Sequence, residues 1–193
     1  MYNICLVGDI LVDVTLKSKN ENLKMRLGGI THSARALWAI SSSYSLGYIS
    51  PKYLDKRISY FFDHFDSPIL IKIAETLNAP NLILIEEAKE IGNQGYELIL
   101  RENNNFEYFD FDFPECDSIL ITSGQYDISR ILKKTGTTPV SLELSNLSIE
   151  DLIALNFIFK NIYISTSSKI FQAYIENNDF YFKNFALLFE KIL

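Results

Sequence analysis

The chain has 193 residues, of which 48% are hydrophobic, enough for one domain with a sizeable core. It carries 18 Lys and Arg against 24 Asp and Glu, so its net charge is −6 and it lacks the positive charge typical of nucleic-acid-binding proteins. No apolar run reaches the ~18 residues of a membrane-spanning helix, and two cysteines are too few for a disulfide scaffold. We therefore expect a cytoplasmic protein that binds neither membranes nor nucleic acid.

Short runs of apolar and β-branched residues recur along the chain and predict strands. Several of them are apolar throughout instead of alternating with polar residues, which is typical of strands buried on both faces of a parallel sheet. The predicted strands cover residues 3–7, 44–49, 69–73, 82–85, 118–122, 140–144 and 162–164.

Stretches with helical spacing of apolar residues lie between these runs, at residues 30–38, 54–65 and 127–134. Ser50 and Pro51 precede the second stretch as an expected N-cap and first-turn proline, and Gly136 follows the third. This alternation of strands and helices predicts an α/β domain with a mostly parallel sheet.

One region departs from the alternation. Residues 96–101 and 106–111 alternate in polarity around a turn rich in asparagine, so we expect an antiparallel hairpin at about 96–111. The chain end, at about 180–193, carries an apolar stripe at helical spacing. Because no linker or internal repeat divides the sequence, residues 1–193 are expected to form a single domain.

The strongest local pattern follows the first predicted strand, which ends at Gly8 and is followed by Asp9 and Asp13. At the carboxyl end of a parallel strand, such acids face the crevice where open α/β sheets bind ligands. One of the two carboxylates could accept hydrogen bonds from ligand hydroxyls. The alternative is that both are solvated turn and edge residues.

A second pattern is Gly28-Gly29, which leads into the predicted helix at 30–38. Glycines allow close approach of a ligand to the backbone, and a helix start offers free N–H donors. The simpler interpretation is a tight turn that requires positive φ. His32, three residues after Gly29, is a weaker candidate for ligand contact, and the two histidines and two cysteines of the chain show no metal-ligand spacing.

Taken together and in order, these features resemble the substrate-side portion of the ribokinase/PfkB family of carbohydrate and nucleoside kinases. Residues 3–13 resemble the first strand of that family, and the di-glycine at 28–29 resembles its sugar-binding segment. The hairpin at 96–111 resembles part of the lid that closes over the sugar, and residues 117–124 resemble a strand that ends in Ser-Gly.

The resemblance implies a three-layer α/β sandwich with a small β-lid, and transfer of the γ-phosphate of ATP to a substrate hydroxyl. Carried over residue by residue, Asp13 would bind substrate hydroxyls, and Gly28 and Gly29 would let the substrate lie against the backbone. Ser33 stands where the family has a substrate-contacting asparagine. These four residues are the substrate-binding candidates.

The departures from the family pattern concern catalysis. Glu143 stands where the family has an aspartate, and Ser165–Ser168 stand where it has an Asn-x-x-Glu motif linked to magnesium. No Asp-Thr-x-Gly-Ala-Gly-Asp segment occurs in the chain. The resemblance therefore implies a fold truncated at its C-terminal, catalytic third, with no catalytic residue and no metal site of its own.

Three hypotheses follow. The first is a degenerate sugar- or nucleoside-kinase-like protein, a pseudoenzyme that keeps the sugar-side crevice but does not catalyse phosphoryl transfer alone. The second is a kinase subunit completed by a partner chain, which would supply the site for ATP and Mg²⁺. The third is a non-catalytic interaction module. We expect a homo- or hetero-oligomer, formed through the lid face or through residues 180–193. The alternative for residues 180–193 is that they fold back as a cap over the sheet of their own chain.

Overall fold

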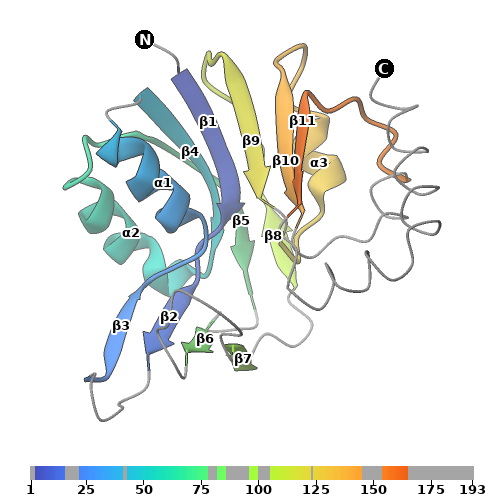
Figure 1. Cartoon of the computed structure of the whole chain (residues 1–193). Helices are drawn as coiled ribbons and strands as arrows, with labels where there is room; N and C mark the ends of the chain where they lie inside the picture. The colour runs from blue at the N-terminus through green and yellow to red at the C-terminus, as the bar shows by residue number, and fades with distance from the viewer. Residues whose placement is uncertain are drawn as a thin grey trace, which may run out of the picture.

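The computed structural model describes residues 3–15, 22–40, 43–77, 82–85, 96–99, 105–122, 124–144 and 154–164. Its main sheet has seven strands in the order β11-β10-β9-β1-β4-β5-β8 (Figure 1). All neighbouring strands in this sheet are parallel except β5 and β8, which are antiparallel. The strands are β1 (Asn3–Asp9), β4 (Ser43–Ser50), β5 (Ile69–Thr76), β8 (Phe106–Tyr108), β9 (Ser118–Thr122), β10 (Val140–Leu144) and β11 (Asn161–Ile164).

A second, smaller sheet lies beyond the carboxyl end of β1 and has the strand order β3-β2-β6-β7 (Figure 1). We call it the lid sheet. β2 pairs antiparallel with β3 and parallel with β6, and β6 pairs antiparallel with β7. The strands are β2 (Val12–Thr15), β3 (Lys24–Leu27), β6 (Leu82–Ile85) and β7 (Tyr96–Ile99).

Helices cover both faces of the main sheet. α1 (Ile30–Ala39) and α2 (Asp55–Phe62), the latter preceded by the 3₁₀ turn η1 (Lys52–Leu54), lie on one face, and α3 (Ile128–Leu132) lies on the other (Figure 1). The pleat of β1 separates the two cores, because successive side chains of a strand point to opposite faces. Leu6 packs with the buried residues of α1 and α2, whereas Cys5 and Val7 pack with those of α3.

The connections reverse direction between β1 and β9. From β1 the chain passes through α1 to β4 and β5 on one side, and it returns at β9 on the other side of β1, from which β10 and β11 continue outward. Open α/β sheets bind their ligands at the carboxyl ends of strands where the strand order reverses in this way. A ligand site is therefore expected in the segments that follow β1 and β9.

The predicted strands and helices are confirmed, with one change at a helix start. Ser50 does not cap the helical segment: its hydroxyl is buried and has no hydrogen-bond partner among the described residues, and Pro51 is the N-cap of η1. Asp127 does cap α3, accepting a hydrogen bond from the backbone N–H of Ser129. The predicted segment at 180–193 lies outside the described residues.

The predicted hairpin of residues 96–101 with 106–111 is wrong. β7 pairs with β6 in the lid sheet, whereas β8 pairs with β5 in the main sheet. The aromatic residues Phe106 and Tyr108 of β8 pack against the core on the α3 side, which gives this strand a hydrophobic reason to join the main sheet. The lid sheet instead joins β6 and β7 to β2 and β3, the two strands that sequence reasoning did not assign.

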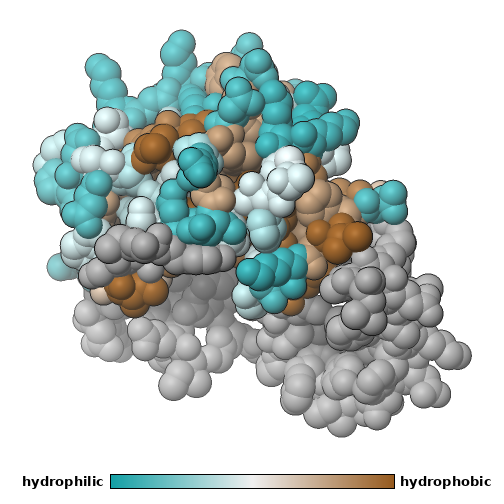
Figure 2. Space-filling view, turned by 90° about the horizontal axis from the view of Figure 1, so that it is seen from above, coloured by the Kyte–Doolittle hydropathy of each residue, from teal (hydrophilic) through white to brown (hydrophobic). Residues whose placement is uncertain are grey.

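The described surface in Figure 2 is largely hydrophilic, in agreement with the 22% of charged residues in the sequence. Figure 2 shows one end of the molecule, where hydrophilic residues cover much of the described surface and hydrophobic residues form patches between them. Within the part of the chain that the structure describes, no helix is long and apolar enough to cross a membrane.

Two isoleucines of β5 differ in burial, so substituting each of them tests how this strand is packed in the main sheet. Ile73 is fully buried, whereas 61% of the surface of Ile69, on the same strand, is exposed. We expect Ile73→Ala to lower the free energy of unfolding by about 2–5 kcal/mol, because it removes buried methylene groups and leaves a cavity. Urea denaturation measures the change. Ile69→Ala is the matched control, and an equal loss in both variants would contradict the described placement of β5.

The two cysteines should differ in reactivity. Cys5 is fully buried in β1, and burial raises the pKa of its thiol to about 11, so almost no thiolate forms at pH 8. Cys116 is half-buried, and burial raises the pKa of its thiol less. We expect a maleimide to label Cys116 first and Cys5 only in urea, as mass spectrometry of labelled peptides can show. Equal native labelling of both thiols would mean that β1 is not central.

Candidate functional site

The candidate site forms where the lid sheet joins the main domain, around Asp13 on β2. Only 5% of this residue is exposed, which is unusual for an acidic side chain. Buried charges are stable only when they are paired or hydrogen-bonded. The contacts of Asp13 therefore decide what the site can do.

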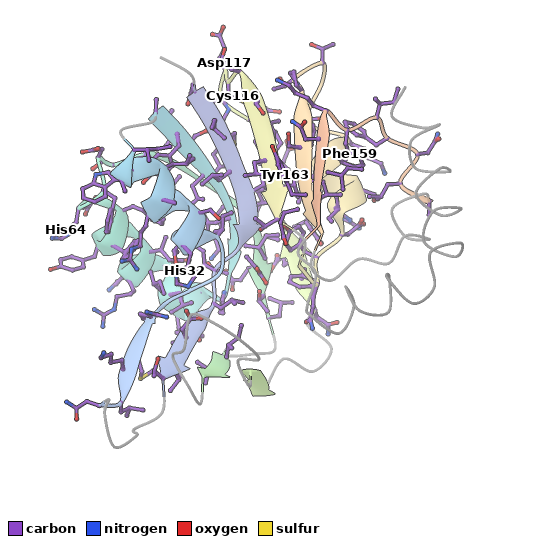
Figure 3. The ribbon with its side chains drawn as sticks, viewed as in Figure 1. His32, His64, Cys116, Asp117, Phe159 and Tyr163 are labelled. Carbon is purple, nitrogen blue, oxygen red and sulfur yellow. The ribbon has the colours of Figure 1, made fainter. Side chains whose placement is uncertain are left out.

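Two cationic or polar side chains contact the same carboxylate oxygen. The ring nitrogen Nε2 of His32 lies 2.8 Å from Oδ2 of Asp13, and Nε of Arg26 lies 3.5 Å from it. His32 stands in the first turn of α1, at the end of the helix that faces the lid sheet (Figure 3). The side chains of His32 and Arg26 are 45% and 51% exposed, so both partners reach Asp13 from the solvent side.

Gly28 forms the wall on the other side of the carboxylate. A Cβ atom placed on Gly28 would overlap the Asp13 carboxylate, so only glycine allows this contact. The neighbouring Gly29 has φ of +62°, and a Cβ on it would overlap the backbone carbonyl of Asp9. The backbone N–H of Gly28 also donates to the carbonyl of Leu11, 2.9 Å away, which joins the di-glycine to the chain between β1 and β2.

The structure thus brings together three of the four predicted substrate-binding residues, namely Asp13, Gly28 and Gly29. Ser33 lies on α1, half-buried, and among the described residues no polar contact joins it to Asp13. Arg26 was not identified from the sequence. A signal was present, because residues 24–27 alternate in polarity as residues 12–15 do, and the resulting pairing sets Arg26 opposite Asp13.

The second acid of the motif, Asp9, lies at the end of β1, beside the chain that follows β9. It is buried, and its carboxyl carbon lies 3.5 Å from where a Cβ atom on Gly124 would stand. Tyr126 is buried next to it and donates its hydroxyl proton to the carbonyl of Thr122. Burial, and next the negative charge of Asp9, raise the pKa of Tyr126 well above its usual value, so this hydroxyl stays protonated.

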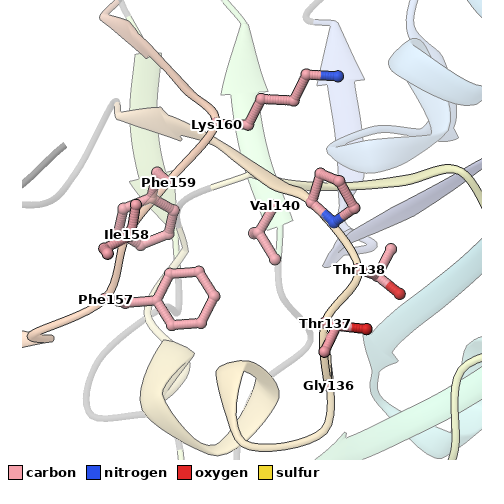
Figure 4. A pocket seen from close by; sticks show the side chains of 9 residues that line it. Gly136, Thr137, Thr138, Val140, Phe157, Ile158, Phe159 and Lys160 are labelled. Carbon is pink, nitrogen blue, oxygen red and sulfur yellow. The ribbon is translucent and has the colours of Figure 1, made fainter. Parts of the chain in front are cut away.

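A separate cavity of about 380 Å³ lies at the opposite end of the main sheet, at the amino ends of β10 and β11. It is lined by residues 136–140 and 157–160 (Figure 4). Val140 and Phe157 supply apolar walls, and Lys160 is the charged residue of the lining. This cavity is remote from Asp13 and contains none of the predicted binding residues.

The described residues do not fit a magnesium–nucleotide site. Among them, no group of three or more His, Cys, Asp or Glu side chains is arranged to hold a metal ion. The sequence also lacks a Gly-Ala-Gly-Asp segment that would hold a phosphate on its backbone.

No protein-family model and no curated protein sequence matches the chain. Solved structures do match it. A fructokinase double mutant from Vibrio cholerae, in a form with bound fructose, ADP and potassium ion, has a TM-score of 0.57 and 14% identity, over 80% of this chain and 56% of that one. A nucleoside kinase from Methanocaldococcus jannaschii, described as an archaeal member of the ribokinase family, has a TM-score of 0.52 and 17% identity. This match covers 85% of this chain and 60% of the nucleoside kinase.

A PfkB family carbohydrate kinase from Listeria grayi has a TM-score of 0.54 and 10% identity, over 79% of this chain and 56% of that one. The chain thus spans somewhat more than half the length of the structures it matches. At these identities the similarity concerns the fold. The expected architecture is confirmed: the described part of this chain has the ribokinase-like α/β fold of the PfkB-type carbohydrate and nucleoside kinases.

Proposed function

We propose that this chain binds a sugar or a nucleoside in the crevice formed by Asp13, Gly28 and Gly29, as the substrate-side portion of a carbohydrate-kinase-like protein. We call this place the Asp13 crevice. The observation that carries the proposal is a carboxylate buried against a glycine backbone while both of its charged or polar partners remain about half exposed.

The chemistry of this arrangement suits a polyol. An ionised carboxylate only accepts hydrogen bonds, and neighbouring hydroxyls of a sugar offer two donors that match its two oxygens. Gly28 and Gly29 have no side chains, so the Asp13 carboxylate and the carbonyl of Asp9 pack directly against their backbone, which holds the carboxylate in place for a ligand. His32 and Arg26 have the solvent exposure that allows them to move aside or to contact the bound molecule.

The alternative is that the contacts of Asp13 have a purely structural role. Asp13 would then serve as an ionic link that ties β2 and β3 of the lid sheet to α1, and nothing would need to enter the crevice. The two interpretations differ in a measurable way, because a structural link affects the stability of the free protein but not its response to a ligand.

The comparisons support the polyol interpretation. The Vibrio cholerae protein that shares this fold was solved with fructose, and another similar structure is a nucleoside kinase. Fructose and nucleosides are therefore the first ligands to test. The proposal concerns binding; ATP and Mg²⁺ would have to be bound by a partner chain.

Thermal unfolding with a panel of fructose, ribose, other sugars and nucleosides tests the proposal. A ligand at 100 times its Kd adds about 2.7 kcal/mol of stability, which raises Tm by several degrees. We expect at least one member of the panel to raise Tm in the unmodified chain and to lose this effect in Asp13→Asn. The substitution keeps the shape of the side chain and removes its charge.

Asp110→Asn is the matched control, because Asp110 also pairs with a cation, Lys134, but lies on the exposed surface away from the crevice. This variant should keep the full response to the ligand. The proposal is contradicted if Asp13→Asn still folds and responds as the unmodified chain does, or if no sugar or nucleoside changes Tm.

A second experiment concerns Gly28. We expect Gly28→Ala to abolish the response to the same ligand, because the added methyl group would occupy space held by the Asp13 carboxylate. Gly136→Ala is the comparison, since a Cβ atom on Gly136 would have open space around it, although the φ of +58° there adds a backbone strain that Gly28 does not have. Equal ligand responses in the two variants would show that the close contact at Gly28 has no part in binding.

The isolated 193-residue chain should consume no ATP with any member of this panel. The reason is the missing glycine-rich segment, without which the charge that develops on a transferred phosphate is not stabilised. A coupled assay for ADP formation measures this. Turnover above background would refute the degenerate interpretation and leave the binding proposal intact.

A further inference from the structure

A cavity of about 670 Å³ lies between α2 and the lid sheet, and Asp13, Gly28 and Gly29 are not among its lining residues. We call it the α2–lid cavity. Val12, Leu27 and Leu82 of the lid sheet contribute one wall, and α2 with its flanking turns contributes the other. This volume lies within the range of about 300–1,000 Å³ that is usual for small-molecule sites.

The wall on the α2 side is aromatic and unusually exposed. Tyr53 of η1 and Tyr60 of α2 expose 57% and 62% of their surfaces, although Ile58 and Phe62 of α2 are buried. Phe61 and Phe65 also line the cavity, and their rings lie 4.6 Å apart. Across from them, on β3, Met25 is 67% exposed. A planar apolar group would cover these side chains and stack on the rings.

The described residues that line the α2–lid cavity carry positive charge, whereas the protein as a whole is negatively charged. Among the residues that the structure describes, Arg26, Arg57 and His64 line the cavity and no Asp or Glu does, although the whole chain has a net charge of −6. Figure 3 shows His64 at the outer side of the α2 region, away from the main sheet. Arg57 forms no ion pair with any other residue in the described ranges. Its guanidinium has five N–H donors, arranged to hold a carboxylate or phosphate.

We propose that the α2–lid cavity binds a small aromatic anion: a planar ring that carries a carboxylate, sulfonate or phosphate group. The ring would lie on Tyr53, Tyr60 and Phe61, and the anionic group would pair with Arg57, with His64 and Arg26 nearby. An uncharged apolar occupant would leave Arg57 without an ionic partner, and a positively charged one would be repelled by it.

The test uses 1-anilinonaphthalene-8-sulfonate, an aromatic anion whose fluorescence rises on binding to apolar surfaces. N-phenyl-1-naphthylamine, which has the same rings without the sulfonate, serves as the uncharged probe. We expect Arg57→Gln to weaken binding of the anion about tenfold, the size of one charge-assisted hydrogen bond, and to change binding of the uncharged probe less than about twofold.

Lys56→Gln is the matched control, because it removes the same charge from the preceding residue of α2, which does not line the cavity. It should leave both affinities within about twofold of the unmodified chain. Equal effects of Arg57→Gln and Lys56→Gln on the anion would overturn the proposal, since only the net charge would then matter. So would an anion affinity that Arg57→Gln does not change.

A further variant tests the aromatic wall. Tyr60→Ala should weaken binding of both probes, because each stacks on the same ring, and it should not alter the mass measured by sedimentation. A mass that falls in this variant would show that a second copy of the chain covers the cavity, and would overturn the small-molecule assignment. Arg26 is left unchanged throughout, so that the result does not depend on the Asp13 crevice.

Discussion

The close packing of the Asp13 carboxylate against the backbone of Gly28 fixes the junction between the lid sheet and the main domain. Two reversals of the chain meet there. After β1 the chain turns into β2, and after β3 it turns into α1, with Gly29 at positive φ against the carbonyl of Asp9. A side chain at either glycine would separate these segments. The position of β2 relative to β1 therefore depends on two residues that have no side chain.

The pleat of β2 gives the lid sheet two chemically different faces. Asp13 points to one side, where His32 and Gly28 meet it, whereas Val12 lines the cavity on the other side together with Leu27 and Leu82. Arg26, opposite Asp13 on β3, reaches both places. The lid sheet thus lies between the polar contacts of Asp13 and the α2–lid cavity, and Arg26 takes part in both.

Much of the fold could be predicted from the sequence because the main strands are apolar on both faces. The runs at β1, β4, β9 and β10 leave few alternatives to a parallel sheet covered by helices on both faces. β2 and β3 were missed because each has only four residues and carries charged side chains. Both segments alternate in polarity, but over four residues this alternation is too short to distinguish a lid strand from a loop.

Which strands pair with one another was harder to predict than where the strands lie in the sequence. Alternation indicated strands near residues 96–99 and 106–108, but it did not show that the first pairs with β6 and the second with β5. Local periodicity fixes which face a side chain takes, whereas pairing is decided by distant contacts. For the same reason Asp13, Gly28 and Gly29 could be named as candidates from their motifs, while the contact of Asp13 with Arg26 required the pairing of β2 with β3.

The most direct measurement of the central claim is a ¹H–¹⁵N NMR titration of the chain with the sugar or nucleoside that raises its Tm most. If the ligand occupies the Asp13 crevice, the backbone amide signals of Gly28, Gly29 and His32 shift in a saturable way. Those of Ile131 and Gly136, near the other end of the fold, stay in place. Saturable shifts confined to α3 or to other parts of the chain, with the di-glycine signals unchanged, would contradict the assignment of the crevice.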